Sequence, residues 1–294
     1  MTSRPRNSTS QMLTGIARAK INLYLHVTGK RSDGYHLLDS LVVFADYGDT
    51  LTVELDSKLS LEISGPFSTC LPLTNDNLVL KAARLLQENA AVEKGAKIKL
   101  VKNLPVASGI GGGSSDAALA LQLLNKLWGA KLSEKQLAEL GLSLGADVPV
   151  CLYGKPTIMS GIGEELSAVS DIPAFYIILV NCNIEVSTAD VFRQLEMRSA
   201  AAPSFALKDG KSADFFFALR GMNNDLQASA SRIAPVIKSV IAEIAGQKGC
   251  QVARMSGSGA TVFGLFETAE SVRKAAESIQ SRHPDWWVRA TTAI

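Results

Sequence analysis

The chain has 294 residues, of which 47% are hydrophobic and 20% charged, so it can bury a packed core and does not have the composition of a disordered protein. Thirty Lys and Arg residues against 28 Asp and Glu residues leave a net charge of +2. This balance is no argument for a nucleic-acid partner, because such proteins usually carry a concentrated basic stripe. No apolar run approaches the roughly 18–20 residues that a membrane-spanning helix needs.

The four cysteines lie far apart without a C-x-x-C pair, and only three histidines are present. Scattered cysteines in a chain of this length indicate reduced thiols and argue against a disulfide framework or a zinc site. We therefore expect a cytoplasmic protein with no nucleic-acid or membrane partner and no metal ion held by side chains alone. The sequence gives no indication of the oligomeric state.

Alternating hydrophobicity predicts a first strand over residues 19–27, with Lys20 and Asn22 on the face opposite its aliphatic side chains. Further strands are predicted over residues 41–45 and 50–55, with Tyr47-Gly-Asp49 as a hairpin connection, and over residues 96–104. Helices are predicted over residues 77–88, 115–128 and 133–144.

The second half predicts strands over residues 174–181, 251–255, 261–266 and 286–292, and helices over residues 187–195, 232–245 and 269–281. The resulting order, strand–helix–strand–strand–helix–strand, is that of a split βαβ (ferredoxin-like) unit. The glycines at 161 and 163 mark a boundary between a mixed α/β N-terminal domain, residues 1–163 with a flexible tail over residues 1–10, and a C-terminal domain, residues 164–294. The fold class is therefore α+β.

A glycine-rich loop between Pro105 and Asp116 connects the strand at 96–104 to the helix that follows. Its glycines leave the backbone open to close approach, and the helix start adds unpaired N–H groups and the positive end of the helix dipole. We interpret the loop as a site for polyphosphate, formed by Pro105, Gly109, Gly111, Gly112, Gly113, Ser114 and Ser115.

Several phosphate-binding classes are excluded. A Walker A loop ends in Gly-Lys-Ser/Thr, and no lysine lies between Pro105 and Asp116. A dinucleotide-binding fold returns from this helix to a parallel strand, whereas here a second helix follows. The His-Arg-Asp and Asp-Phe-Gly motifs of protein kinases are both missing from the sequence.

The loop resembles the second motif of the GHMP kinase superfamily, and the resemblance extends over nearly the whole chain. It is carried by Ala19-Lys-Ile-Asn-Leu23, Asp33-Gly-Tyr-His36, Ser114-Ser-Asp-Ala-Ala118, Gly145-Ala-Asp-Val-Pro149 and Arg254-Met-Ser-Gly-Ser-Gly-Ala260. The resemblance implies a two-domain, ATP-dependent small-molecule kinase, with an ATP-binding N-terminal domain and a substrate-binding C-terminal domain. The second and fourth segments are similar to the branch that phosphorylates the 2-hydroxyl of a cytidylyl-linked methylerythritol in non-mevalonate isoprenoid synthesis.

The resemblance also implies roles for individual residues. Asp147 is expected to orient the substrate hydroxyl and accept its proton, and Lys20 to hold Asp147 and offset charge on the transferred phosphoryl group. The cytosine is expected to contact Tyr35 and His36 on one side and Phe192, with Thr188 nearby, on the other; Asn22 is expected to contact a substrate hydroxyl.

The adenine pocket is expected at Asn77 and Leu78, although Asn77 is also a plausible helix N-cap. Ser114 and Ser115 are candidates for binding phosphate or Mg²⁺, or for capping the helix. Because the sequence offers no dedicated pair of carboxylates, Mg²⁺ is expected to arrive with ATP and to be held mainly by its phosphates.

Two alternatives remain open from the sequence. One is another GHMP kinase, acting on homoserine, mevalonate or a sugar. The other is a nucleotide-binding regulator that keeps the fold without turnover, which would have no need of both Lys20 and Asp147.

Overall fold

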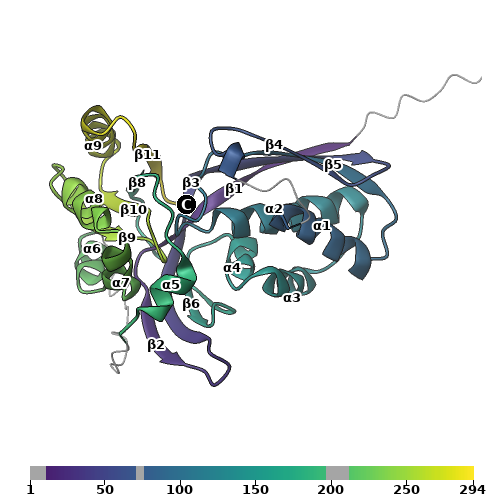
Figure 1. Cartoon of the computed structure of the whole chain (residues 1–294), viewed down its shortest axis with the longest axis horizontal. Coiled ribbons are helices and arrows are strands. Elements are labelled where there is room, and N and C mark those ends of the chain that lie inside the picture. Colours follow the sequence, from purple (N-terminus) through teal and green to yellow (C-terminus); the bar gives the residue numbers. More distant parts are fainter. Residues whose placement is uncertain (1–10, 71–75, 197–211) are drawn as a thin grey trace, which may run out of the picture.

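A computed structural model describes residues 11–70, 76–196 and 212–294 of the chain. The predicted flexible tail, residues 1–10, lies outside the described residues. Two β-sheets divide these residues between them: a seven-stranded sheet in the first half of the chain and a four-stranded sheet in the second (Figure 1). The α+β class is confirmed. No helix in the described parts of the chain is long and apolar enough to span a membrane.

The first sheet has the order β4-β5-β3-β6-β7, and β1 and β2 also pair with the long central strand β3. Only β4 and β5 run parallel. Its strands are β1 (Met12–Asn22), β2 (His26–Lys30), β3 (His36–Asp56), β4 (Ser60–Ser64), β5 (Gly95–Val101), β6 (Thr157–Gly161) and β7 (Glu165–Ala168). The predicted domain boundary at residue 163 falls between β6 and β7, and it stays a prediction.

The hairpin predicted at Tyr47-Gly-Asp49 is wrong, because β3 runs without interruption through these residues. The glycine in this segment allows a close contact between β1 and β3 instead of a turn. A Cβ atom on Gly48 would lie 2.1 Å from the carbonyl oxygen of Ala17, so only glycine lets β1 approach here. The β1–β3 register shifts between Arg18 and Lys20, directly beside this contact.

Four helices accompany the first sheet, namely α1 (Leu78–Asn89), α2 (Gly112–Trp128), α3 (Glu134–Leu144) and α4 (Val148–Tyr153); a short 3₁₀ turn spans Ser68–Cys70. Helices α1 and α2 bury Leu86, Leu121 and Leu124 against the aliphatic side chains of β3 and β5. The predicted N-cap of α3 is confirmed: Ser133 forms a capping box with Gln136.

The second sheet is antiparallel with the order β11-β8-β10-β9, which confirms the split βαβ arrangement. Its strands are β8 (Tyr176–Asn181), β9 (Cys250–Met255), β10 (Val262–Phe266) and β11 (Trp287–Thr292). The helices of this half are α5 (Thr188–Arg193), α6 (Ser212–Arg220), α7 (Leu226–Ile233), α8 (Val236–Ala245) and α9 (Ala269–Arg282).

The single helix predicted over residues 232–245 is wrong in its first turn. The chain forms α7 and α8 with a break at Ala234, whose backbone is non-helical (φ −127°, ψ 85°). Pro235 explains the break, because proline lacks an N–H group and disfavours helical geometry in the residue before it.

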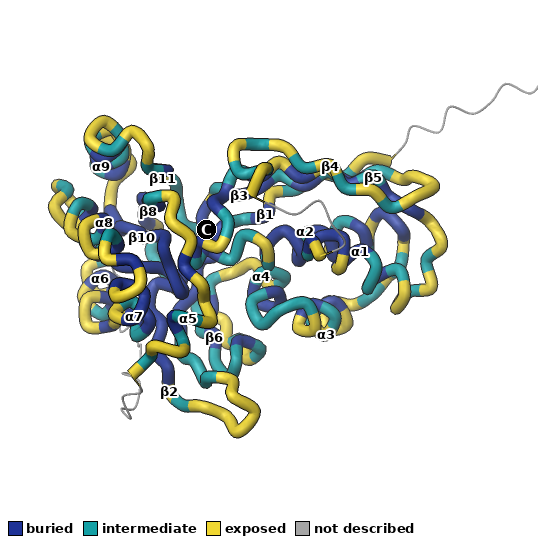
Figure 2. Tube along the Cα trace, in the orientation of Figure 1, coloured by how far each residue is buried: buried dark blue, intermediate teal, exposed yellow. Residues whose placement is uncertain are grey.

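One hydrophobic core joins the two sheets (Figure 2). Along β8, Ile178 and Val180 face α8 and α9, whereas Ile177 and Leu179 face the opposite way and pack with Ile21 and other side chains of β1 and β3. The predicted strand over residues 19–27 is interrupted at this junction. β1 ends at Asn22, and the next residues bond to both halves, for example Leu25 to the carbonyl of Asn223.

Candidate functional site

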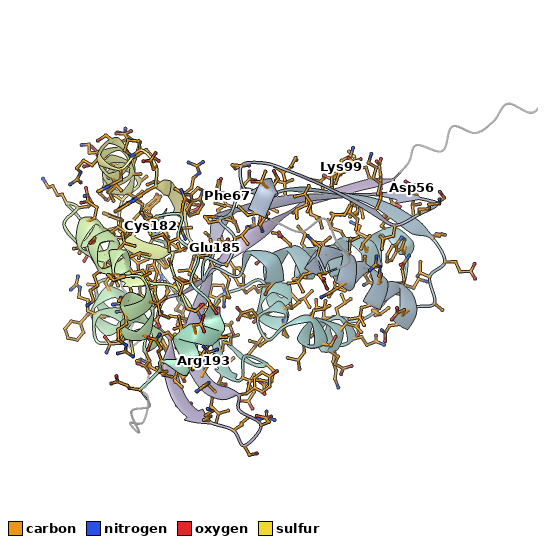
Figure 3. All side chains as sticks on the ribbon, viewed as in Figure 1. Asp56, Phe67, Lys99, Cys182, Glu185 and Arg193 are labelled. Carbon is orange, nitrogen blue, oxygen red and sulfur yellow. The ribbon has the colours of Figure 1, made fainter. Side chains whose placement is uncertain are left out.

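A cavity of about 1070 Å³ lies where the two halves meet. It is bordered by β1, the β2–β3 hairpin, the glycine loop, α5 and the loop before β10. In Figure 1, α5 lies between the second sheet and the helices of the first half, and Figure 3 shows Arg193 on it. All the site residues predicted from the sequence line this cavity, except Asn77 and Ser115.

The glycine loop leads directly into α2, which begins at Gly112, three residues before the predicted start. Gly111 is its N-cap with a left-handed backbone (φ 65°) and no side-chain cap, so the first N–H groups of α2 have no capping side chain. A Cβ on Gly111 would lie 3.2 Å from the Cβ of Lys20. The helix N-terminus is therefore packed onto β1, and its backbone donors lie beside the predicted catalytic lysine.

The structure brings Lys20 and Asp147 together. The Nζ atom of Lys20 lies 2.8 Å from Oδ2 of Asp147, with the lysine side chain 4% exposed and the aspartate 38% exposed. Asp147 occupies the N-cap position of α4, yet its carboxylate makes no cap hydrogen bond. One end of the ion pair is thus fixed by burial, and the other reaches into the cavity.

Asn22 lies on the same strand face, two residues from Lys20, and is fully buried. Its Nδ2 atom donates to the Ser40 hydroxyl at 2.8 Å, and its backbone N–H donates to the Ser256 hydroxyl at 3.1 Å. Its Oδ1 atom is buried without a hydrogen-bond partner among the described residues. Buried amide oxygens normally have a partner, so this acceptor is an exception in the wall of the cavity that Asn22 lines.

An aromatic cluster also lines the cavity. The rings of His36 and Phe192 stack with their centroids 4.8 Å apart, and Tyr35 stands beside them with 57% of its surface exposed. Lys30 is the cross-strand partner of His36. Burial lowers the pKa of His36 and the charge of Lys30 lowers it further, so the imidazole is neutral at pH 7.

Two predicted residues serve the local fold. The side chain of Asn77 caps α1 by accepting the N–H of Val79 at 2.9 Å. The Ser115 hydroxyl donates to the carbonyl of Arg18 at 2.7 Å and so faces β1. Leu78 and Ser114 line the cavity. Thr188 does so too, with its hydroxyl 2.7 Å from that of Ser258.

Sequence reasoning missed a buried charge cluster next to the glycine loop. Lys102 bridges Asp49 and Asp116, with its Nζ atom 2.5 Å and 2.6 Å from their Oδ2 atoms. Asp49 lies on β3, Lys102 directly follows β5, and Asp116 lies on α2. The order of the glycine motif placed Asp116 near the loop, but no spacing indicated that Asp49 would join it. No three His, Cys, Asp or Glu side chains among the described residues, this cluster included, gather as metal ligands.

Two protein-family models match the chain. Residues 77–155 match the GHMP kinases N terminal domain, and residues 215–285 match the GHMP kinases C terminal family. The chain is 51% identical over 287 residues to the 4-diphosphocytidyl-2-C-methyl-D-erythritol kinase of Dinoroseobacter shibae, which covers 96% of this chain and 95% of that protein. It is 48% identical over 284 residues to the protein of the same name in Parvibaculum lavamentivorans, covering 96% and 98%.

Solved structures agree with this match. A crystal structure of a 4-(cytidine 5'-diphospho)-2C-methyl-D-erythritol kinase aligns with a TM-score of 0.76 at 32% identity, covering 96% of this chain and 99% of that chain. The homoserine kinase of Cytophaga hutchinsonii aligns with a TM-score of 0.72 at 20% identity, covering 98% and 97%. The mevalonate kinase of L. major aligns with a TM-score of 0.71 at 16% identity, covering 99% of this chain and 98% of that chain. The last two show a shared fold.

Proposed function

Because the chain belongs to the GHMP kinases, and within them to the 4-diphosphocytidyl-2-C-methyl-D-erythritol kinases, we propose that its cavity carries out their reaction with Lys20 and Asp147. The protein is an ATP-dependent phosphotransferase of non-mevalonate isoprenoid synthesis. It transfers the γ-phosphoryl group of ATP to the 2-hydroxyl of 4-diphosphocytidyl-2-C-methyl-D-erythritol and releases ADP. The observation that supports the proposed residues is the ion pair between Lys20 and Asp147, which lines the same cavity as the N-terminus of α2 and the aromatic cluster.

Asp147 orients the substrate hydroxyl and takes its proton as the oxygen attacks the γ-phosphorus. The bond from the γ-phosphorus to the oxygen bridging it to the β-phosphorus then breaks, and ADP leaves with that oxygen. Phosphoryl transfer has a loose transition state with little early proton transfer, so a carboxylate suffices as the base. The Lys20 ammonium holds the carboxylate in place and offsets negative charge on the transferred group. Asn22, which lines the cavity, contacts a substrate hydroxyl.

ATP places its phosphates at the N-terminus of α2, where Gly111, Gly112 and Gly113 leave room for close approach. Leu78 contacts the adenine from the start of α1. Mg²⁺ would be held mainly by the ATP phosphates, with the Ser114 hydroxyl as a candidate ligand, and would offset charge on the phosphates. We place the reaction in the cytoplasm, consistent with four cysteines that are all unpaired.

The cytosine binds at the aromatic cluster. The 4.8 Å separation of His36 and Phe192 leaves no space for a base between those two rings, so the exposed face of Tyr35 is the available stacking surface. A neutral imidazole at His36 can accept or donate one hydrogen bond to the polar edge of the base. Lys30, beside it, contributes positive charge near the diphosphate of the substrate.

Replacing Tyr35 with alanine is expected to raise the KM for the cytidylyl substrate about 5- to 150-fold, because stacking a base on an aromatic ring contributes about 1–3 kcal/mol. The change in kcat should be smaller, since the contact is remote from the transferred group. Steady-state kinetics with saturating ATP measure both constants. A loss confined to kcat would contradict the assignment of Tyr35 to the base.

The substrate assignment is tested by measuring ADP release with a panel of alcohols. Turnover is expected with 4-diphosphocytidyl-2-C-methyl-D-erythritol, and none with mevalonate, homoserine or galactose. Cytidine diphosphate should inhibit competitively against the alcohol and not against ATP. If the protein binds ATP but turns over no alcohol, it is a nucleotide-binding regulator and the proposal fails.

A further inference from the structure

The two reactants of the proposed reaction meet different segments of the cavity wall. Lys20 and Asn22, on β1, belong to the side that meets the alcohol, and the glycine loop with the N-terminus of α2 belongs to the side that meets the ATP phosphates. Transfer needs the attacking oxygen and the γ-phosphorus about 3–3.5 Å apart. The contacts between β1 and the glycine loop therefore decide whether two bound ligands are also placed to react.

Hydrogen bonds join β1 directly to the glycine loop and to the helix that follows it. The Ser115 hydroxyl donates to the carbonyl of Arg18 at 2.7 Å, and the N–H of Lys20 donates to the carbonyl of Ile110 at 2.9 Å. Asn22, the last residue of β1, is joined to the loop in another way, through a side chain from the second half of the chain.

Ser256, in the loop before β10, makes this connection. Leu23 donates its N–H to the carbonyl of Leu41 on β3, so Asn22, one residue earlier, directs its own N–H away from that strand. The Ser256 hydroxyl accepts this N–H at 3.1 Å and donates to the carbonyl of Gly109 at 3.1 Å. The side chain is fully buried and does not line the cavity. One hydroxyl thus bonds to the alcohol side and to the phosphate side from behind the cavity wall.

The position of this hydroxyl is itself fixed by its surroundings. The N–H of Ser256 donates to the carbonyl of Thr261 at 2.9 Å, across the loop. Asn224 is buried, and its Nδ2 atom donates at 2.8 Å to the carbonyls of Met255 and Gly257, the residues on either side of Ser256. Because the backbone around it is held in this way, the hydroxyl can keep its two partners at a fixed separation.

We propose that Ser256 is a positioning residue for phosphoryl transfer, whose hydroxyl sets the separation between the alcohol site on β1 and the phosphate site at the glycine loop. This inference rests on the proposed function, because it assumes that the alcohol meets β1 and that ATP places its phosphates at α2. Loss of the hydroxyl leaves both sites in place but frees one to shift relative to the other. Each ligand should therefore still bind, and the transfer step should become slower.

The test compares the wild-type protein with Ser256→Ala, using MgATP and 4-diphosphocytidyl-2-C-methyl-D-erythritol. The transfer rate in a single turnover is measured by rapid quench, with saturating MgATP and with enzyme in excess over the alcohol and above its dissociation constant. It is expected to fall about 10- to 100-fold, because a misplacement of about 1 Å is enough for such a loss. The dissociation constants of MgATP and of the alcohol, each measured alone by calorimetry, should change less than about threefold. An unchanged transfer rate, or a loss confined to either dissociation constant, would overturn the inference.

A conservative variant tests the hydroxyl itself. Ser256→Thr keeps a hydroxyl at this position, so it should recover most of the transfer rate that Ser256→Ala loses. If folded Ser256→Thr is as slow as Ser256→Ala, the hydrogen bonds of Ser256 do not position the reactants and the inference is wrong. Far-UV circular dichroism and a thermal melt establish that the variants are folded.

Thr157→Val is the matched control for loss of stability. Thr157 is fully buried on β6, donates its hydroxyl to the carbonyl of Ser167 at 2.8 Å and does not line the cavity. Its replacement removes a buried hydrogen bond of the same kind, so it should lower the melting temperature much as Ser256→Ala does, while the transfer rate changes less than about twofold. Equal losses of rate in Thr157→Val and Ser256→Ala would overturn the inference.

The outcomes also separate this inference from the proposed function. A wild-type protein that turns over no alcohol removes the proposed function and this inference with it. A wild-type protein that turns over the alcohol at the same rate as Ser256→Ala overturns the inference alone.

Discussion

Replacing Asp147 with asparagine is expected to lower kcat about 100- to 10,000-fold, the range over which a positioned general base contributes. An amide keeps the shape of the side chain and a hydrogen bond from Lys20, but it cannot accept the proton of the substrate hydroxyl. Binding of ATP should be nearly unchanged, because the phosphates meet the glycine loop. Steady-state kinetics, combined with calorimetry for ATP, separate the two effects.

Asp46→Asn is the matched control. Asp46 is an aspartate of the same half, is 51% exposed and forms a surface ion pair with Arg18 at 3.3 Å, and it does not line the cavity. Its replacement should change kcat less than twofold, because exposed ion pairs contribute at most about 1 kcal/mol to stability and this one does not reach the substrate. Near-native turnover by folded Asp147→Asn would show that the base lies elsewhere.

Replacing Gly109 with alanine is expected to lower the free energy of unfolding by about 2–4 kcal/mol and to raise the KM for ATP at least about tenfold. Gly109 has a left-handed backbone (φ 75°), and a Cβ there would lie 2.4 Å from the carbonyl oxygen of Ser256 and 2.6 Å from the backbone nitrogen of Gly259. The glycine loop would have to move off the loop before β10. Chemical denaturation and ATP kinetics measure the two consequences.

Gly129→Ala separates backbone strain from steric overlap. Gly129 ends α2 with a similar backbone (φ 66°), but a Cβ there would meet nothing within 4 Å. This variant should lose only the cost of a left-handed alanine, about 1–2 kcal/mol, and keep its KM for ATP. Equal effects of the two substitutions on ATP binding would mean that the contact between the two loops is unimportant for the nucleotide.

Much of the site could be predicted because its residues lie in short contiguous motifs. The alternation of β1 placed Lys20 and Asn22 on one face, and the strand–glycine–helix order placed the N-terminus of α2 at the cavity. The resemblance then paired Lys20 with Asp147 across more than a hundred residues. Periodicity alone could not have done so, because it describes local structure and carries no information about which distant turn a strand will meet.

The parts that were missed depend on contacts between distant segments. Glycine at position 48 is typical of a turn. In the folded sheet, however, its lack of a side chain lets β1 approach β3, and the sequence alone does not show this contact. In the sequence, Lys102 and Asp49 look like ordinary polar residues near the ends of predicted strands. They become a buried cluster because β3 pairs with β5 and α2 packs against β3, and a charge buried in this way is visible only after three elements are assembled.

The continuous core between the two sheets limits how the cavity can admit its ligands. Ile177 and Leu179 of β8 share one apolar interior with Ile21 of β1, and Arg254 of β9 donates hydrogen bonds to the backbone carbonyls of Leu23, Leu219 and Met222. Opening the halves like a clamshell would expose this interior to water and break those bonds. The two sheets therefore form one frame, and a hinge between them would lose the burial of this interior.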